Sequence, residues 1–390
     1  MPVSKVLVVG AGIGGLGAAA ALGQRGVEVD VIDVKPDSHV LGVGINQPGN
    51  SLRALDALGV LDEILEAGFA YDGNTFNDWH ENEIVKLPSI LGDDRVPANN
   101  ALTRSNLHRI LKGAAERAGA RIRYSTTVAD LVDDGEAVDV TLSDGGTARY
   151  DAVAAFDGVN SAMRSRLFGE DVKPVFTGFG IWRVQLPRPA HITRCNVYQG
   201  SQRKAGLIPL SQEHMYMFLV TPEPDNPHYD PATFHLTLRE KLADYTGIIG
   251  QIRDGLTADS GIVYSPLNEI MKPLPWHAGR VIVLGDAVHA AAPHLTQGAG
   301  MALEDAVVLA DELSADRPVE ESLAAVGETR FERVKLVSDV SHAILEAEMQ
   351  ITEENMPAAI EHMRAELPGQ TAFLESQLNL PFRNAAHANA

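Results

Sequence analysis

Residues 280–310, RVIVLGDAVHAAAPHLTQGAGMALEDAVVLA, carry the most informative pattern in the chain. A run of apolar residues predicts a strand that ends at Gly285 and Asp286, and a loop of small residues leads from there into a helix that begins near Gly298. The first turn of a helix presents backbone N–H groups without partners and the positive end of a dipole. This segment therefore predicts a site for a ligand group that carries negative charge.

The start of the chain has a second pattern of the same kind, VLVVGAGIGGLG at residues 6–17. The spacing of Gly10, Gly12 and Gly15 is typical of a tight turn that brings backbone close to a pyrophosphate and a helix close to a strand. Asp33 ends the next strand, where its carboxylate can accept hydrogen bonds from ribose hydroxyls. Asp30 is the neighbouring alternative, but it lies inside the alternating strand. Two such turns, separated by most of the chain, predict one long flavin dinucleotide rather than a nicotinamide alone.

Two aspartates after strands allow more than one interpretation. Asp286 could hold a flexible polyol such as the ribityl chain, or it could be an ordinary helix cap. The N–H groups of residues 298–301 could stabilise the anionic edge of a reduced flavin. Asp157 and Gly158 follow the strand at residues 151–155, and an Asp-Gly pair taken singly is more often only a turn.

Composition narrows the class of protein. The chain has 390 residues, 45% hydrophobic and 22% charged, which fits a globular protein of two domains or one large unit. A formal charge of −20 argues against nucleic acid and anionic membranes as partners. The single cysteine, Cys195, excludes an internal disulfide and fits a reducing compartment. We find neither a leader pattern nor an apolar run long enough to span a membrane, and we expect a soluble, cytoplasmic protein.

The predicted fold is α/β: a Rossmann-like dinucleotide domain with an inserted antiparallel sheet and a helical C-terminal segment. We assign residues 1–72, 98–175 and 266–335 to the first, 73–97 and 176–265 to the inserted domain, and 336–390 to C-terminal helices and a tail. Within them we expect one helix over 51–67, a hairpin over 71–87 that turns near Glu81, and a helix over 102–118 capped by Ser105.

Five motifs occur in order: GAGIGGL, GVGINQPGN, LTRSNLH, FDGVNSAMR and GDAVHAAAPHLTQGAGMALEDA. Together they resemble the class A flavin-dependent aromatic hydroxylases, the p-hydroxybenzoate hydroxylase group, over residues 3–340. The resemblance implies non-covalent FAD, NADH or NADPH as reductant, and O₂ as co-substrate. It also implies hydroxylation of a small aromatic or heteroaromatic hydroxyl compound through a C4a-hydroperoxyflavin.

The resemblance also assigns cofactor contacts. It implies that Arg104 reaches the cofactor from its helix, that Asp157 serves the pyrophosphate and the reductant, and that Asp286 binds the ribityl chain. The full set expected to bind FAD is Gly10, Gly12, Ile13, Gly14, Gly15, Asp33, Gly44, Arg104, Val128, Asp157, Gly158, Gly285, Asp286, Gly298, Ala299, Gly300 and Met301. Two departures from the family pattern are Phe156, where a small residue is usual before the central DG, and Thr296, where GQG is common.

Candidates for substrate binding and catalysis lie on the inserted sheet and on the loop after Asp286. His214, Tyr216 and Phe218 share one face of a strand under period-two geometry. Tyr216 and Lys204 match a strand-pair pattern that resembles urate-type hydroxylases, in which a basic residue and a tyrosine meet the substrate. The alternatives are that Tyr216 packs in the core with its hydroxyl satisfied and that Lys204 is exposed at a strand end.

The loop adds further candidates. His294, directly after Pro293, resembles the PH pair of hydroxynicotinate-type members and could be a proton acceptor or could cap a backbone group. Asn46 matches a substrate-facing position of the family, and Arg183 could counter a substrate carboxylate or pair with an acid of a C-terminal helix. We take Tyr216, His294 and Lys204 as catalytic candidates, and Asn46, Arg183, Tyr216, His214 and Pro293 as substrate contacts.

Three functions compete. The first is the FAD-dependent, NAD(P)H-consuming monooxygenase described above. The second is a flavin oxidoreductase of the same fold that inserts no oxygen, or one that acts on a larger polycyclic ring. The third is a Rossmann protein that binds only a nicotinamide. We find no His/Cys cluster with metal-ligand spacing, and the sequence is compatible with a homodimer.

Overall fold

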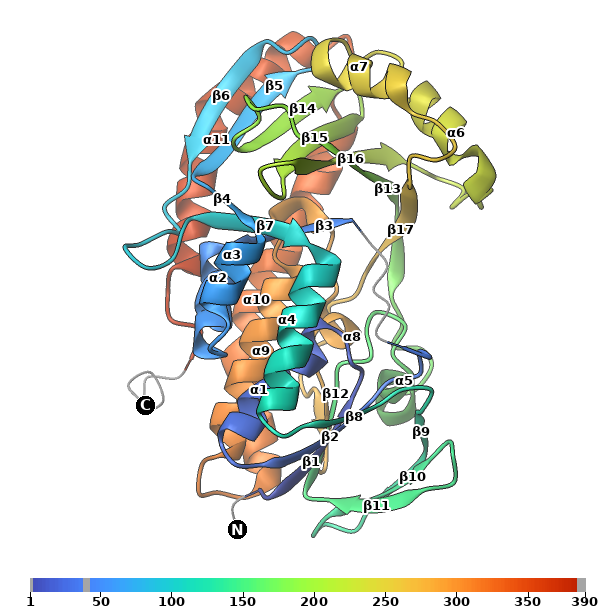
Figure 1. The fold of residues 1–390 in the computed structure, drawn as a ribbon, viewed down its shortest axis with the longest axis vertical. Coiled ribbons are helices and arrows are strands. Elements are labelled where there is room, and N and C mark those ends of the chain that lie inside the picture. Colours follow the sequence, from blue (N-terminus) through green and yellow to red (C-terminus); the bar gives the residue numbers. More distant parts are fainter. Residues whose placement is uncertain (1–2, 38–42, 384–390) are drawn as a thin grey trace.

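The computed structural model describes residues 3–37 and 43–383, so the segments 1–2, 38–42 and 384–390 lie outside the described residues. Figure 1 shows an elongated molecule with a helix-covered sheet at one end and a second, larger sheet at the other. Part of the GVGINQPGN motif and most of the C-terminal tail fall in the segments outside the description. Among the described helices, none is long and apolar enough to cross a membrane.

A six-stranded sheet forms the centre of the first half. Its order is β18 (His277–Ala278), β19 (Val281–Val283), β12 (Ala152–Ala155), β1 (Lys5–Val9), β2 (Glu28–Ile32) and β8 (Arg121–Arg123). The strands from β19 to β8 pair in parallel, and only β18 is antiparallel. The carboxyl ends of β1, β12 and β19 therefore meet at one edge, which is where ligands bind in sheets of this kind.

Three helices pack beside this sheet: α1 (Ile13–Gln24), α4 (Arg104–Arg117) and α9 (Gly298–Leu313). Helix α1 is built largely from glycine and alanine, so α9 approaches it closely; a Cβ added at Gly17 would lie 3.0 Å from Leu303. Helix α1 follows β1, and α9 follows β19 after the loop that contains α8 and η2, so both helices are preceded by strands of the same sheet. This packing places the two glycine-rich turns side by side.

Two small sheets and several short helices complete this half. The first sheet comprises β9 (Val128–Asp133), β10 (Val138–Leu142) and β11 (Thr147–Tyr150), and the second β3 (Gly44–Pro48), β7 (Asn99–Thr103) and β4 (Phe69–Tyr71). The short helices are α2 (Gly49–Ala57), α3 (Leu61–Ala67), α5 (Ala162–Phe168) and α8 (Asp286–His289). The 3₁₀ turn η2 (Pro293–Leu295) follows α8.

A seven-stranded sheet forms the other half, in the order β17 (Val263–Glu269), β13 (Val175–Pro187), β16 (His214–Pro222), β15 (Arg203–Pro209), β14 (Cys195–Gly200), β5 (Gly73–Asp78) and β6 (Glu83–Pro88). It is antiparallel except where β14 and β5 pair in parallel. The 3₁₀ turn η1 (Pro231–Thr233) leads into α6 (Phe234–Lys241), which is followed by α7 (Gly247–Gly255). Apolar residues of α6 and α7 bury the outer face around Trp182. The inner face, with Tyr216 and Ile208, is turned toward β7 and the glycine-rich turns.

Two long helices end the described chain: α10 (Val319–Met349) and α11 (Met356–Leu378). Helix α10 packs against α9 and also contacts η2 and β15, so it passes from one half to the other, while α11 lies along β6. The boundary proposed at residue 335 falls inside α10, and the division into domains stays a prediction.

Two local predictions were wrong. The stretch 51–67 is not one helix, because Gly59 adopts a φ of 69° and separates α2 from α3. Helix α4 is capped by Thr103, whose side chain accepts a hydrogen bond from Asn106 N, and not by Ser105. The hairpin of β5 and β6 is confirmed, with Glu81 at its turn in the left-handed region (φ 68°).

Candidate active site

The two glycine-rich turns form one continuous structure. A Cβ added at Gly10 would lie 2.4 Å from the carbonyl oxygen of Phe156, and one at Gly15 would lie 1.9 Å from the carbonyl oxygen of Gly10. At Gly285, the Cβ would lie 3.3 Å from Ala302 at the start of α9. Only glycine fits the first two positions, because the obstructing atoms are backbone.

Gly12 differs from its neighbours in the same turn. A Cβ added there meets nothing within 4 Å, because Gly12, the N-cap of α1, is exposed beside the buried Ala11. The space in front of it faces the N–H groups of the first turn of α1, which suit a pyrophosphate. The turn therefore fits the dinucleotide that its sequence predicts.

Phe156 fills the junction between the turns. Its ring is 2.6 Å from a Cβ added at Gly14 and 3.4 Å from one added at Gly285, and the side chain is buried. The phenylalanine that departs from the family pattern thus packs between the two turns.

The two candidate acids of the first turn have separate partners. Asp33 accepts hydrogen bonds from Ala11 N and Lys35 N, both at 2.8 Å. Asp30 is buried and accepts hydrogen bonds from Tyr150 Oη at 2.9 Å and Arg121 Nε at 2.8 Å. Asp33 therefore lies at the turn itself, while Asp30 is part of an ion pair on the sheet.

Asp157 supports the start of α5, whose N-cap is Ser161. Its carboxylate accepts hydrogen bonds from Ser161 Oγ at 2.5 Å and Met163 N at 3.0 Å. Gly158 has a φ of 79° and open space beyond its Cα. Val128 is buried at the start of β9, in the three-stranded sheet with β10 and β11. The contacts with Ser161 and Met163 explain Asp157 without a ligand, and its role toward cofactor or reductant stays a prediction.

The second turn leaves its polar groups free. Asp286 is exposed and makes no side-chain hydrogen bond to any of the residues that the structure describes. The first hydrogen bond of α9 runs from Met301 N to Gln297 O, so the N–H groups of residues 298–300 precede the helical ladder. A Cβ added at Gly300 would lie 1.8 Å from Ser51 Oγ, which has no partner of its own within the described chain.

Two further buried polar atoms near these turns lack partners among residues 3–37 and 43–383: Arg104 Nε and Asn46 Oδ1. Asn46 Nδ2 donates to Asn99 Oδ1 at 3.0 Å and to Thr296 Oγ1 at 3.2 Å, which ties β3 to the loop before α9. Thr296 holds this contact from the left-handed region (φ 55°), an unusual conformation for a β-branched residue. Unpartnered buried atoms are costly and indicate a missing ligand.

Arg183 and Tyr216 lie on the inner face of the large sheet, and the side chain of Arg104 from α4 lies close to both. Arg183 makes no hydrogen bond or ion pair to any described residue, and burial lowers its pKa to about 10. Burial also raises the pKa of Tyr216, whose ring lies 2.3 Å from a Cβ added at Gly44. Phe218 pairs directly with Arg183 across the strands, so these side chains share one face.

His214 is the exception on this strand. It shares the register of Tyr216 but lies exposed at the first position of β16, opposite Pro187. Period-two geometry predicted the face correctly but not how far the buried part of the strand extends. We therefore do not keep His214 as a substrate contact.

Lys204 and His294 meet at a residue that the sequence did not single out, Glu348 near the end of α10. Lys204 Nζ lies 2.5 Å from Glu348 Oε1, and His294 Nε2 lies 3.2 Å from Glu348 Oε2. All three side chains are buried, so Lys204 is not exposed at a strand end. Pro293 precedes His294 at the start of η2. On the sheet, Lys204 pairs with Val220 whereas Tyr216 pairs with Ile208, so the catalytic candidates form two separate groups.

Beneath the second turn lies a network of fully buried charges. Arg330 of α10 contacts Glu304 at 2.7 Å and Asp305 at 2.8 Å. Asp305 also accepts from His289 Nε2 at 2.6 Å and from Gly285 N at 3.1 Å. Burial raises the pKa of Asp305, but the contacts with His289 and Arg330 outweigh burial and hold that pKa below its ordinary value. His289 therefore braces the turn through Asp305.

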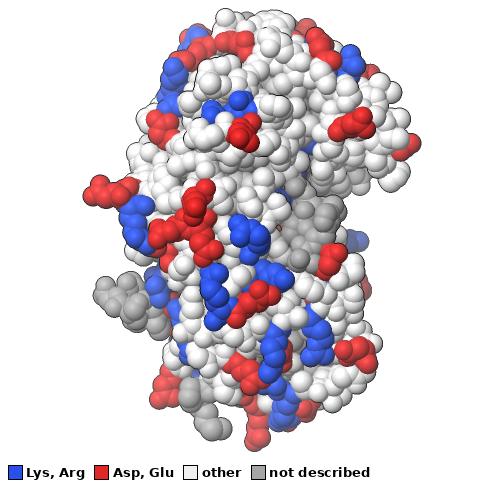
Figure 2. All heavy atoms as spheres, viewed as in Figure 1, with Lys and Arg blue, Asp and Glu red and all other residues white. Residues whose placement is uncertain are grey.

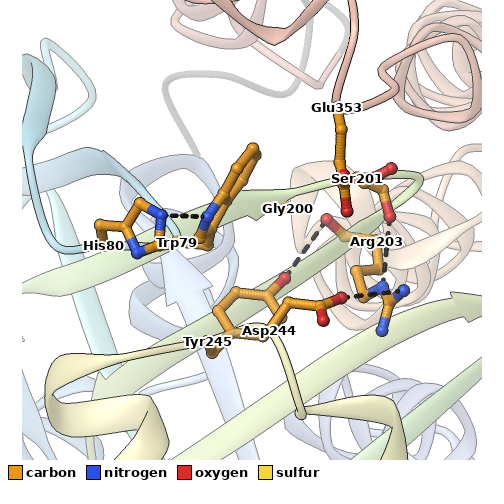
Figure 3. Close-up of a pocket in the computed structure, with 8 residues that line it drawn as sticks. All are labelled: Trp79, His80, Gly200, Ser201, Arg203, Asp244, Tyr245 and Glu353. Atoms are coloured by element: carbon orange, nitrogen blue, oxygen red, sulfur yellow. Dashed lines mark hydrogen bonds and ion pairs between the residues drawn. The ribbon is translucent and has the colours of Figure 1, made fainter.

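A pocket of about 340 Å³ lies apart from these groups, at the outer end of the large sheet (Figure 3). Its lining comprises Trp79, His80, Gly200, Ser201, Arg203, Asp244, Tyr245 and Glu353. Most of its polar groups contact one another: Arg203 donates to Ser201 O at 3.2 Å and pairs with Asp244 at 3.3 Å. Acidic and basic side chains are interspersed over the face shown in Figure 2, without a single dominant sign.

The comparisons with known proteins decide the family. The profile of the FAD binding domain family matches residues 3–322. A relative named "Putative FAD-dependent monooxygenase YetM", from Bacillus subtilis (strain 168), is 31% identical over 342 residues, which cover 87% of this chain and 92% of that protein. The chain belongs to the FAD-dependent monooxygenase family.

Two further relatives agree with this assignment. The 6-hydroxynicotinate 3-monooxygenase of Pseudomonas fluorescens is 29% identical over 366 residues, with 87% of this chain and 90% of that protein covered. HpxO of Klebsiella pneumoniae, solved with FAD and uric acid, has the same fold, with a TM-score of 0.86, 22% identity and 96% of each chain covered. As a member of this family the chain is a flavoprotein monooxygenase with FAD as its cofactor, and the nicotinamide-only alternative is excluded.

Proposed function

We propose that this FAD-dependent monooxygenase consumes NADH or NADPH and hydroxylates a small aromatic or heteroaromatic hydroxyl compound that also carries an anionic group. The observation that carries the proposal is Arg183, a partly buried cation without a partner among the described residues, on the sheet face opposite the glycine turns. A buried charge is stable only when it is paired, so this position favours an anionic ligand.

When bound, FAD would supply the redox chemistry, taking the reducing equivalents of the nicotinamide and passing them to O₂ so that one oxygen atom could enter the ring and the other leave as water. The residues proposed to hold FAD are those of the two turns, with Asp33 toward a ribose and Asp286 toward the ribityl chain. The N–H groups of residues 298–300 and the side chain of Arg104, which lies close to Arg183 and Tyr216, are proposed to contact the flavin ring.

The protein's own residues would then position and activate the substrate. Arg183 binds its anionic group, Tyr216 donates to a ring substituent from a water-poor environment, and Asn46 and Pro293 border the ring. A protonated substrate hydroxyl must lose its proton to make the ring more nucleophilic, and His294 is the candidate acceptor. The burial of all these groups excludes water, which would otherwise divert the activated oxygen.

A carboxylated heteroaromatic ring fits this arrangement best. The related 6-hydroxynicotinate 3-monooxygenase is named for such a substrate, with a ring hydroxyl and a carboxylate. The competing activities within the same fold are flavin oxidoreduction without oxygen insertion and hydroxylation of a larger polycyclic ring.

The test is a substrate panel of hydroxybenzoates, hydroxypyridines and purines, with the FAD-loaded protein and both nicotinamides. We expect a carboxylated hydroxypyridine to stimulate NAD(P)H oxidation and O₂ uptake in equal amounts, with a product one oxygen heavier. Consumption of NAD(P)H without a heavier product would favour the oxidoreductase alternative. Tyr216→Phe should keep its FAD and yet slow or uncouple hydroxylation; full coupling in that variant would make Tyr216 a packing residue.

A further inference from the structure

We propose that Glu348 is a positioning residue: it orients His294 and sets its tautomer, so that Nδ1 is the atom that accepts the proton of the substrate hydroxyl. This inference rests on the proposed function for its chemical consequence, but the tautomer itself can be measured without any substrate.

The geometry places one carboxylate between two basic side chains from different parts of the fold. Glu348 is 12% exposed, Lys204 is 9% exposed and the side chain of His294 is 0% exposed. Glu348 Oε1 meets Lys204 Nζ of β15 at 2.5 Å, and Oε2 lies 3.2 Å from His294 Nε2 of η2. The second contact falls short of a well-aligned hydrogen bond, as is common for catalytic contacts before a ligand is bound.

An ionised carboxylate can only accept hydrogen bonds, so the histidine nitrogen that faces it must carry a proton. In a neutral imidazole the other nitrogen, Nδ1, then has a free lone pair. His294 Nδ1 is buried and has no hydrogen-bond partner within residues 3–37 and 43–383. It is therefore the nitrogen of His294 that remains available to a ligand hydroxyl.

The charges around His294 keep it in the form that can accept a proton. Burial lowers the pKa of His294, and the positive charge of Lys204 lowers it further, against the smaller opposing effects of Glu348 and Glu269. Burial raises the pKa of Glu348, but Lys204 and His294 outweigh it and hold that pKa below its ordinary value. At neutral pH Glu348 is thus anionic and His294 neutral.

The proton transfer balances within this group. The O–H bond of the substrate hydroxyl breaks, its electron pair stays on oxygen, and an Nδ1–H bond forms. The resulting imidazolium has Nε2–H directed at Glu348, so the new positive charge forms beside an existing negative one. The contact with Lys204 helps to keep the Glu348 carboxylate ionised, because it lowers the pKa of Glu348.

The experiment is an NMR titration of the FAD-loaded protein labelled with ¹⁵N and ¹³C in histidine, with His294 assigned through a His294→Gln variant. We expect wild-type His294 to be the Nε2–H tautomer. Glu348→Gln should lower the His294 pKa and populate both tautomers, because an amide can donate or accept. Glu348→Asp keeps the charge, so its His294 pKa should lie between those of Glu348→Gln and the wild type. Glu346→Gln, on the exposed side of the same helix, should change neither property.

An Nδ1–H tautomer in the wild-type protein overturns the proposal, and so does a Glu348→Gln variant with unchanged tautomer and pKa. Should Glu348→Gln fail to fold, the wild-type spectrum decides alone. In turnover, we expect Glu348→Gln to lower kcat by roughly 10- to 100-fold and to shift its pH profile, with FAD content unchanged. If no panel compound is hydroxylated while the tautomer is as expected, the proposed function fails and the assignment of Glu348 as the residue that sets the tautomer stands.

Discussion

Two arginines show the difference between the halves of this molecule. Arg330 lies under the second glycine turn and is paired with Glu304 and Asp305, and all three side chains are 0% exposed. Arg183 lies on the inner face of the large sheet and has no partner among the described residues. The first arginine is part of the folded scaffold, whereas the second is compensated only when a ligand arrives.

This contrast extends to the surrounding residues. Gly10 and Gly15 of the first turn fit against backbone oxygens at distances that leave no room for a side chain, and the charges beneath the second turn are paired with one another. On the sheet side, Arg104 Nε, Asn46 Oδ1 and His294 Nδ1 are buried without partners. Substitutions in the first region should therefore change stability, and substitutions in the second should change ligand binding.

The largest expected effect separates two glycines of one turn. Gly15→Ala places a Cβ 1.9 Å from a backbone oxygen and should destabilise the fold by several kcal/mol, at the upper end of single substitutions. Gly12→Ala meets open space and should leave the apoprotein within about 0.5 kcal/mol of wild type. Its methyl group should nevertheless occupy the position proposed for the pyrophosphate, so FAD should bind at least about tenfold more weakly. Urea unfolding and FAD titration of both variants test this; equal stability losses would contradict it.

Arg330→Met should cost about 3–5 kcal/mol, because it removes the buried cation that Glu304 and Asp305 share and leaves them only Arg333 and His289. The arginine helps to hold the pKa values of Glu304 and Asp305 below their ordinary values. That contribution to stability is present above the unfolded pKa, near 4, and is lost as the pH falls through the folded values. The deficit of the variant should thus be larger at pH 7 than near pH 4. Arg364→Met, which removes an exposed pair with Glu361, is the control and should change little.

The same substitution at Arg183 should not lower the free energy of unfolding. Arg183→Met removes a partly buried charge that has no partner among the described residues, so the free energy of unfolding should stay constant or rise by up to about 1 kcal/mol. The KM for a carboxylated hydroxypyridine should increase at least about tenfold, while Arg183→Lys should retain part of the affinity. Comparison with the same ring lacking the carboxylate isolates the charge effect. An equal KM for both rings in wild type would show that Arg183 has another role.

The smallest effect concerns the cap of α4, from which Arg104 projects. Thr103→Ala should lower stability by about 1 kcal/mol, because Asn106 N loses its side-chain acceptor. Ser105→Ala should have a much smaller effect. Thermal unfolding of the two variants compares them directly, and a larger loss for Ser105→Ala would restore the cap that the sequence predicted.

The scaffold was predictable because its constraints are local. The spacing of glycines between a strand and a helix states a backbone requirement that the neighbouring residues alone reveal, and both turns were found in this way. The cap at Thr103 and the break at Gly59 were missed, because serine and threonine are almost equivalent caps and an isolated glycine inside an apolar pattern is often tolerated.

The substrate side was less predictable because its partners are distant in sequence. Alternation predicted the face of Tyr216 but not the exposure of His214, since burial at a strand end depends on what covers it. Glu348 sits in a helical run that is rich in glutamate, and nothing local distinguishes it from Glu346. Only the packing of α10 against β15 and η2 selects one of the two.

Helix α10 has a further consequence for how this chain tolerates change. Arg330 and Glu348 are about 27 Å apart on one uninterrupted helix, so the helix fixes the distance between the charges beneath the second turn and the Lys204–Glu348–His294 group. Inserting one residue between them would turn the far carboxylate by about 100° and displace it by about 1.5 Å, away from both its basic neighbours. Length variation should therefore be tolerated in the loops around α10 and excluded from the stretch between these two residues.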